Sequence, residues 1–347
     1  MKALVVKKPG FLEVMDVEEP TMGPYDARCE MLYGATCTGT DLHVIDGKFA
    51  EHVDYPSIIG HESIGRVLEV GEKVRYLKKG DLVTRVLTRE SADGKMKLSW
   101  GGMCEFGLAC DWKAMMEDGV DEKKAKYYQI NKVIPEGLID PMNATMIITW
   151  RENLSYIQRI GVKEGEIVLI SGSGANGISL GAMARLCGAA EVIMVGSENR
   201  RKAALKAGIT SYYNYREEAD IRYIQKKYSS SLDYIIDATG KSESMNPYLG
   251  CLKAGGVVGV YGMDDLNTYA MNPTLVKADF YRVYNGGYLE PETHDRVIEF
   301  IREGKLDASV WIDQEHIFTW ENAPEAYEYV RAKKAIKTVI RLSQGGK

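Results

Sequence analysis

The sequence predicts an α/β protein of two domains, one rich in short strands and the other built on a doubly wound parallel sheet. Three observations support this. A chain of 347 residues is too long for one hydrophobic core of ordinary size. Its first part contains short strand-like runs separated by glycine turns. Its middle alternates apolar strands with helical stretches, a rhythm typical of parallel sheets.

The individual elements follow from this pattern. In the first part the strand-like runs are residues 3–6, 64–70 and 81–86. In the middle we expect strands at residues 167–170, 192–195, 233–238 and 257–261, with helices at 178–186 and 199–207. The tail returns to mixed character, with a helix at 293–303 and a final strand at 335–342.

Composition and charge exclude several classes of protein. Apolar residues make up 45% and charged residues 27% of the chain, as in ordinary globular proteins. The net charge of -5 gives no support for binding to nucleic acid or to an anionic membrane. The first residues resemble a strand and not a signal peptide, no stretch is apolar enough to span a bilayer, and the six cysteines are scattered. We therefore expect a cytoplasmic protein with a small-molecule partner.

A glycine motif predicts a dinucleotide site. Gly172-Ser173-Gly174-Ala175-Asn176-Gly177 follows an apolar strand and opens a helical stretch. In that context Gly172 permits a tight turn, Gly174 lets the backbone approach a pyrophosphate, and Gly177 lets helix and strand pack closely. Free N–H groups at the helix N-terminus, including those of Ala175 and Asn176, would face the phosphates.

The end of the next strand bears on the choice between NAD and NADP. NAD sites often place a carboxylate there, but this strand ends in Gly196-Ser197. Ser197 and Arg200 leave room and charge for a 2′-phosphate, which favours NADP. Glu198 favours NAD, and the arginines of this helix could equally form a solvated face, so the cofactor is NADP or NAD.

Cys37, His61 and Asp140 form a plausible set of three ligands for a catalytic zinc, which would leave a fourth position open. A thiolate and a carboxylate would offset the charge of the ion. Spacing alone is weak support, because a single cysteine is more often a small buried apolar residue.

The motifs around these residues resemble those of zinc-containing medium-chain alcohol dehydrogenases. They are Cys-x-Gly-Thr-Asp-Leu-His from Cys37, Gly-His-Glu-x-x-Gly-Arg-Val from Gly60, the glycine motif, and Asp237-Ala-Thr-Gly. The match covers nearly the whole chain in the family's order. The resemblance implies a GroES-like catalytic domain, residues 1–140 and 285–347, split around a Rossmann domain, residues 141–284.

Roles follow from the same resemblance. It implies that Cys37 and His61 bind zinc, that Glu62 lies beside the metal, and that Thr40 and His43 relay a proton. Tyr215, in Asn214-Tyr215-Arg216, matches a tyrosine beside the adenosine phosphate in NADP-using bacterial secondary-alcohol dehydrogenases. A homo-oligomer, dimer or tetramer, is also implied.

This chain departs from the family's pattern at three places. Thr38-Gly39 adds one residue between the cysteine and the Thr-Asp pair, which could displace Cys37. Asp140-Pro141 stands where many members have Glu-Pro. Residues 88–110 lack the four cysteines of a structural zinc lobe, so one zinc per chain is expected.

The leading hypothesis is a zinc-dependent enzyme that transfers a hydride between a secondary alcohol, polyol or sugar and NAD(P), or reduces the matching ketone. A zinc-free quinone or enoyl reductase of the same superfamily is one alternative. A non-catalytic nucleotide-binding protein on this fold is another. Neither alternative needs the zinc ligands and the relay residues together.

Overall fold

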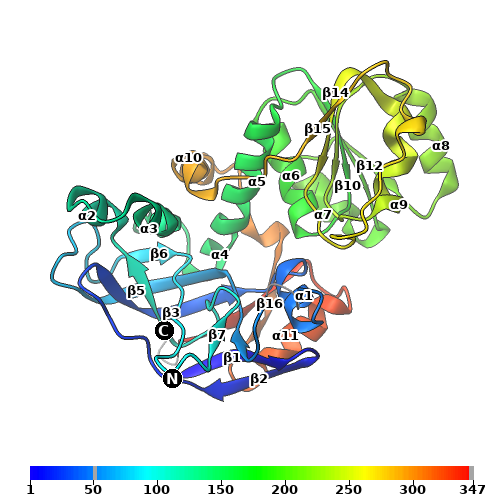
Figure 1. The fold of residues 1–347 in the computed structure, drawn as a ribbon. Coiled ribbons are helices and arrows are strands. Elements are labelled where there is room, and N and C mark those ends of the chain that lie inside the picture. Colours follow the sequence, from blue (N-terminus) through cyan, green and yellow to red (C-terminus); the bar gives the residue numbers. More distant parts are fainter. Residues whose placement is uncertain (50–52, 344–347) are drawn as a thin grey trace. The chain divides into compact units, whose positions relative to one another are not determined.

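The computed structural model describes residues 1–49 and 53–343 (Figure 1). It divides into two compact units, one of Met1–Ile148 with the segment from His294 onward, and one of Thr149–Thr293. The predicted boundaries were 140 and 284, so both boundaries lie further along the chain than predicted. Two contacts explain the second one: Arg151 pairs with Glu290, and Thr293 Oγ1 donates to the Arg151 carbonyl at 2.7 Å.

The first unit is rich in β-structure, as predicted. A four-stranded sheet has the order β2-β1-β4-β7, and a seven-stranded sheet has the order β16-β17-β3-β5-β6-β9, with β8 also paired to β3. The strands are β1 (Lys2–Lys8), β2 (Phe11–Asp16), β3 (Asp26–Ala35), β4 (Ser57–Ile58), β5 (Glu62–Val70), β6 (Leu82–Thr84), β7 (Lys97–Leu98), β8 (Phe106–Cys110), β9 (Val133–Ile134), β16 (Ile312–Phe318) and β17 (Lys337–Arg341). The helices are α1 (Thr40–Ile45), α2 (Trp112–Glu117), α3 (Glu122–Tyr127), α4 (Pro141–Ala144), α10 (His294–Arg302) and α11 (Ala323–Arg331).

Strand register in this unit brings distant segments together at one end of β3. Strand β5 runs antiparallel to β3, with Ala35 opposite Glu62. Strand β17 pairs with the other edge of β3, also antiparallel, with Val339 opposite Ala35. Cys37, which follows the end of β3, therefore lies close to the first residues of β5 and of β17.

The second unit contains the predicted doubly wound sheet, coloured green to orange in Figure 1. Its six strands are parallel and have the order β12-β11-β10-β13-β14-β15. They are β10 (Ile167–Ser171), β11 (Glu191–Gly196), β12 (Ser211–Asn214), β13 (Leu232–Asp237), β14 (Leu252–Val260) and β15 (Arg282–Tyr284). Helices of this part are α5 (Met146–Ile160), α6 (Ala175–Leu186), α7 (Arg201–Lys206), α8 (Glu218–Lys227) and α9 (Ser242–Met245).

Strand order in this sheet places a ligand site. The chain moves outward from β10 to β11 and β12, then returns to the other side of β10 as β13. Such a reversal opens a crevice at the carboxyl ends of the two central strands, where dinucleotides bind. The glycine motif follows β10, and α6 begins directly after Gly174. No helix among the described residues is long and apolar enough to cross a membrane.

Candidate functional site

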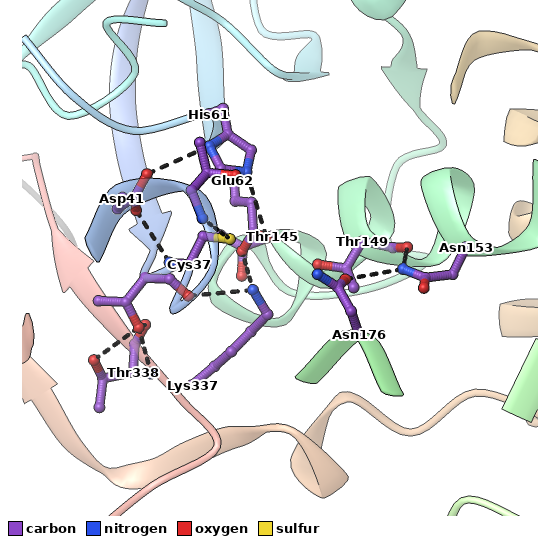
Figure 2. Close-up of polar contacts among 12 residues, drawn as sticks. Cys37, Asp41, His61, Glu62, Thr145, Thr149, Asn153, Asn176, Lys337 and Thr338 are labelled. Atoms are coloured by element: carbon purple, nitrogen blue, oxygen red, sulfur yellow. Dashed lines mark hydrogen bonds and ion pairs between the residues drawn. The ribbon is translucent and has the colours of Figure 1, made fainter. Parts of the chain in front are cut away.

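Cys37, His61 and Glu62 form a compact buried cluster at the end of β3 (Figure 2). One ligand atom from each residue lies within 4.8 Å of the others. Their exposed fractions are 5%, 5% and 2%, so the cluster is almost fully shielded from water. The pairing of β3 with β5 explains why these residues meet. Ala35, the last residue of β3, lies opposite Glu62, and Cys37 follows Ala35 by two residues.

The additional residue in the cysteine motif does not displace Cys37. Its N–H donates to Asp41 Oδ2 at 3.0 Å, and the N–H of Thr40 donates to Cys37 Sγ at 3.4 Å. Thr38 and Gly39 form the turn before α1 and accommodate the insertion. Backbone bonds to the sulfur and the carboxylate thus fix the thiol beside His61.

Asp41 orients His61 from behind. Its Oδ1 lies 3.4 Å from His61 Nδ1, and its Oδ2 accepts from Tyr327 Oη at 3.0 Å. Burial lowers the pKa of His61, but contacts with Asp41 and Cys37 outweigh it and raise that pKa well above the usual value. The other ring nitrogen of His61, Nε2, lies 3.8 Å from Glu62 Oε1 and faces the cluster. A carboxylate behind a histidine is the usual support of a metal ligand. Asp41 stands in the motif that begins at Cys37, but no role was predicted for it from the sequence.

Lys337, the first residue of β17, forms an ion pair with Glu62. Its Nζ contacts Glu62 Oε2 and donates to the Thr36 carbonyl at 3.2 Å (Figure 2). Burial lowers the pKa of Lys337, but Glu62 and Cys37 outweigh it and the net pKa is raised. Sequence reasoning missed Lys337; the available signal was a lysine within the apolar run Ala335–Leu342.

The donor set fits a divalent metal ion. Cys37, Asp41 and Glu62 can each carry a negative charge, and Lys337 pairs with one of them. Buried anions are stable only when further positive charge compensates them. Thiolate, imidazole and carboxylate together suit zinc.

Asp140 does not join this cluster, which corrects the predicted ligand set. It is exposed and caps the N-terminus of α4. Its Oδ1 accepts from the N–H groups of Met142 and Asn143 at 3.1 Å, and its Oδ2 accepts from Asn143 Nδ2 at 2.5 Å. Because Pro141 opens α4, an aspartate before it is a good helix cap. The carboxylate of the cluster is that of Glu62.

Thr40 and His43, the two residues predicted to relay a proton, lie one turn apart on α1. Thr40 is half-buried and begins the helix beside Cys37. His43 is only 4% exposed in the structure. Its Nδ1 contacts the Gly39 carbonyl, and its ring stacks on Phe49 at 5.2 Å. His43 is therefore held in place within the first unit and is not a surface side chain there.

The glycine motif of the second unit has the geometry that its spacing predicts. Gly172 has φ +108°, and a Cβ on it would lie 2.7 Å from Thr239 Cγ2. A Cβ on Gly177 would lie 2.0 Å from the Gly172 carbonyl oxygen, so helix and strand pack in contact. Gly174 is exposed, with no atom within 4 Å of its Cβ position. The loop is thus closed on the protein side and open on the side where a pyrophosphate would lie.

Ala175 and Asn176 form the first turn of α6. Ala175 is buried, whereas Asn176 is half-buried and its Oδ1 accepts from Asn153 Nδ2 at 3.1 Å. Asn153 Nδ2 also donates to the Thr149 carbonyl at 2.6 Å (Figure 2). These two hydrogen bonds fix the orientation of the Asn176 amide. The sequence did not predict them.

At the end of β11, Glu198 is paired with an arginine. Arg201 binds it through two bonds, Nε–Oε1 at 2.7 Å and Nη2–Oε2 at 2.9 Å. Arg201 lowers the pKa of Glu198, which keeps that carboxylate ionised. Ser197 and Arg200 are half-buried, and Tyr215 is 44% exposed with its hydroxyl accepting from Arg216 at 3.2 Å.

Comparison with known proteins agrees with these sites. Residues 24–120 match the alcohol dehydrogenase GroES-like domain, and residues 176–303 match the zinc-binding dehydrogenase domain. An L-threonine 3-dehydrogenase of Streptomyces avermitilis is 31% identical over 277 residues, 76% of this chain and 77% of that one. D-arabinitol dehydrogenase 1 of Uromyces fabae is 23% identical over 348 residues, 98% and 97% of the two chains. The crystal structure of a zinc-binding dehydrogenase from Sinorhizobium meliloti bound to NADP has a TM-score of 0.74 at 22% identity, covering 98% of each chain.

The chain therefore belongs to the zinc-containing medium-chain alcohol dehydrogenase family. It is an NAD(P)-dependent oxidoreductase acting on small-molecule alcohols or polyols, and zinc is its metal. The predicted fold class and function are confirmed. This assignment is preferred over the zinc-free reductase and the non-catalytic alternative.

Proposed function

We propose that this enzyme oxidises a secondary alcohol, a polyol or a sugar, or reduces the matching ketone, at one zinc ion held by Cys37, His61 and Glu62. The observation that carries this proposal is the mutual distance of 4.8 Å or less among their ligand atoms in a buried site. Both reported relatives support the substrate class, since D-arabinitol is a polyol and position 3 of threonine carries a secondary hydroxyl.

The chain's own residues would divide the work. Zinc, when bound, acts as a Lewis acid that makes the alcohol hydroxyl more acidic. Asp41 holds the His61 imidazole in the orientation of a ligand, and Lys337 fixes one oxygen of Glu62. Thr40 Oγ1 would accept the hydroxyl proton and pass it toward His43, because a hydroxyl both accepts and donates.

Turnover with and without metal tests this function. We expect the purified enzyme to reduce NAD(P) with a secondary alcohol or polyol, to lose this activity on complete removal of metal by a chelator, and to regain it with added zinc. Full activity after complete chelation would contradict the proposed role of the metal.

We predict that the enzyme uses NADP(H) at least as well as NAD(H). The two bonds from Arg201 engage Glu198, so the residue that favoured NAD is already paired. Ser197, Arg200 and Tyr215 are the proposed contacts for a 2′-phosphate. Comparing kcat/KM for the two cofactors checks this. A preference for NAD(H) of more than about tenfold, roughly 1.4 kcal/mol, would show that Glu198 binds the ribose instead.

We also propose a homo-oligomer in the cytoplasm. Strand β15 is the edge of the six-stranded sheet, and it leaves Val283 56% exposed next to Phe280, which is 64% exposed. An unpaired apolar edge of this kind favours pairing with a second chain. All six cysteines are free, which suits a reducing compartment. Neither a nucleic acid nor a membrane is expected as a partner.

A further inference from the structure

A buried tyrosine of helix α11 reaches the carboxylate behind His61. Tyr327 is 1% exposed, and its Oη donates to Asp41 Oδ2 at 3.0 Å. The two residues are 286 positions apart in the sequence. They meet because α11 and α1 lie close together within the first unit (Figure 1). The tyrosine supplies no metal ligand itself, so any effect on the metal cluster must pass through Asp41.

Contacts on both sides of Tyr327 fix its position relative to α1. Arg331, one turn further along α11, binds Asp46 at the end of α1, with Nη2–Oδ1 at 2.8 Å and Nη1–Oδ2 at 3.1 Å. Just before the tyrosine, the Ala326 carbonyl accepts from Thr338 Oγ1 at 3.4 Å, which ties α11 to β17. The hydroxyl is therefore presented to Asp41 by helices that are themselves held in place.

The two oxygens of Asp41 have different partners. Oδ2 accepts from the Cys37 N–H and from the Tyr327 hydroxyl, both at 3.0 Å. Oδ1 lies 3.4 Å from His61 Nδ1, and neither of these two atoms has a hydrogen-bond partner elsewhere among the described residues. Because two donors hold Oδ2, the carboxylate is turned so that Oδ1 faces the imidazole.

Only one of the two donors to Oδ2 is a side chain. The Cys37 N–H belongs to the backbone, and a single bond to it would leave the carboxylate more freedom to rotate about its Cβ–Cγ bond. Burial raises the pKa of Tyr327 well above its usual value, so the hydroxyl stays protonated and remains a donor. A hydrogen bond to a carboxylate is stronger than one between neutral groups, and the partner behind a metal-binding histidine sets the orientation of its ring.

We propose that Tyr327 is a positioning residue of the metal site, which acts through Asp41 to hold His61 in the orientation of a ligand and so strengthens zinc binding. The inference rests on the proposed function, because it needs zinc at Cys37, His61 and Glu62. It gives α11 a part in the site although this helix supplies no ligand.

The zinc affinity of the folded protein tests this role. The holoenzyme is titrated with a chelator of known zinc affinity, and circular dichroism and the unfolding midpoint are measured on the same samples. Tyr327→Phe removes only the hydroxyl and should weaken zinc binding about tenfold, at the lower end of what such supporting partners contribute. A purely structural hydroxyl would lower the unfolding midpoint and leave the zinc affinity unchanged. Tyr329→Phe is the matched control on the same helix, because its hydroxyl lies 3.3 Å from His316 Nδ1 and does not contact Asp41, and it should bind zinc as the wild type does.

A double-mutant cycle shows whether the effect passes through Asp41. In an Asp41→Ala background the tyrosine hydroxyl has lost its acceptor, so adding Tyr327→Phe should change the zinc affinity by less than about twofold. If Tyr327→Phe does not fold, Tyr327→Met replaces it, because methionine also lacks a donor and adapts to the space, and the same tenfold loss is expected.

The outcomes separate the two proposals. A wild-type enzyme that binds no zinc would overturn the proposed function. If the wild type binds zinc, an unchanged affinity in folded Tyr327→Phe would overturn the positioning role and leave the proposed function intact. An equal loss of affinity with and without the Asp41 carboxylate would do the same.

Discussion

His61→Ala should lose its zinc and about a thousandfold or more of its turnover while remaining folded. The imidazole is one of the three proposed ligands, and Asp41 Oδ1 lies 3.4 Å from its Nδ1. Loss of the metal removes several kcal/mol of charge stabilisation, and ~4 kcal/mol corresponds to roughly a thousandfold in rate. Metal analysis, circular dichroism and kcat/KM on the same preparation measure the three effects.

Asp140→Ala is the control for that experiment, because sequence reasoning gave Asp140 the same role as His61. Asp140 caps α4 at the surface, so its loss should cost about 1 kcal/mol of stability and no zinc. If Asp140→Ala lost the metal and a Glu62→Gln variant kept it, the ligand set proposed for this enzyme would be wrong.

Thr40→Val should lower kcat roughly 100-fold to 10,000-fold while zinc stays bound. The substitution keeps the shape of the side chain and removes the hydroxyl that we propose accepts the substrate proton. Thr40 N–H still reaches Cys37 Sγ in the variant, so the cluster should keep its form. Thr40→Ser restores the hydroxyl and should recover most of the activity. An active Thr40→Val enzyme would contradict the relay.

The second relay residue is tested by the dependence of rate on pH. His43→Ala should lose about 10-fold to 100-fold near pH 7 and less at high pH, where hydroxide accepts the proton directly. Added imidazole should rescue part of the loss. His43 also stacks on Phe49, so a purely structural role would lower the rate equally at every pH. An unchanged pH profile in His43→Ala would remove His43 from the relay.

Local patterns predicted much of the fold. The strand before Gly172 and the helix after Gly174 lie where the apolar run and the glycine motif place them. The predicted helix at 293–303 is α10 (His294–Arg302), and the predicted last strand at 335–342 is β17 (Lys337–Arg341). The domain boundaries could not be found in this way, because they depend on contacts such as Arg151 with Glu290, which are far apart in sequence.

The candidate site shows the same division between local and long-range information. Cys37, His61 and Glu62 stand in short motifs, and the resemblance of those motifs to a known family predicted Cys37 and His61 as ligands with Glu62 beside the metal. Lys337 joins them only because β17 pairs with β3 in one register, a fact of topology that the sequence does not display. Asp140 was chosen for its residue type, but its neighbour Pro141 makes it a helix cap.

X-ray absorption at the zinc edge of the purified holoenzyme tests the central claim most directly. With Cys37, His61 and Glu62 as ligands, the spectrum should show about one zinc per chain with one sulfur neighbour at about 2.3 Å and the remaining neighbours nitrogen or oxygen at about 2.0–2.2 Å. In Cys37→Ser the sulfur signal should disappear. Two zinc ions per chain, several sulfur neighbours, or a sulfur signal that persists in Cys37→Ser would contradict a single metal site at this cluster.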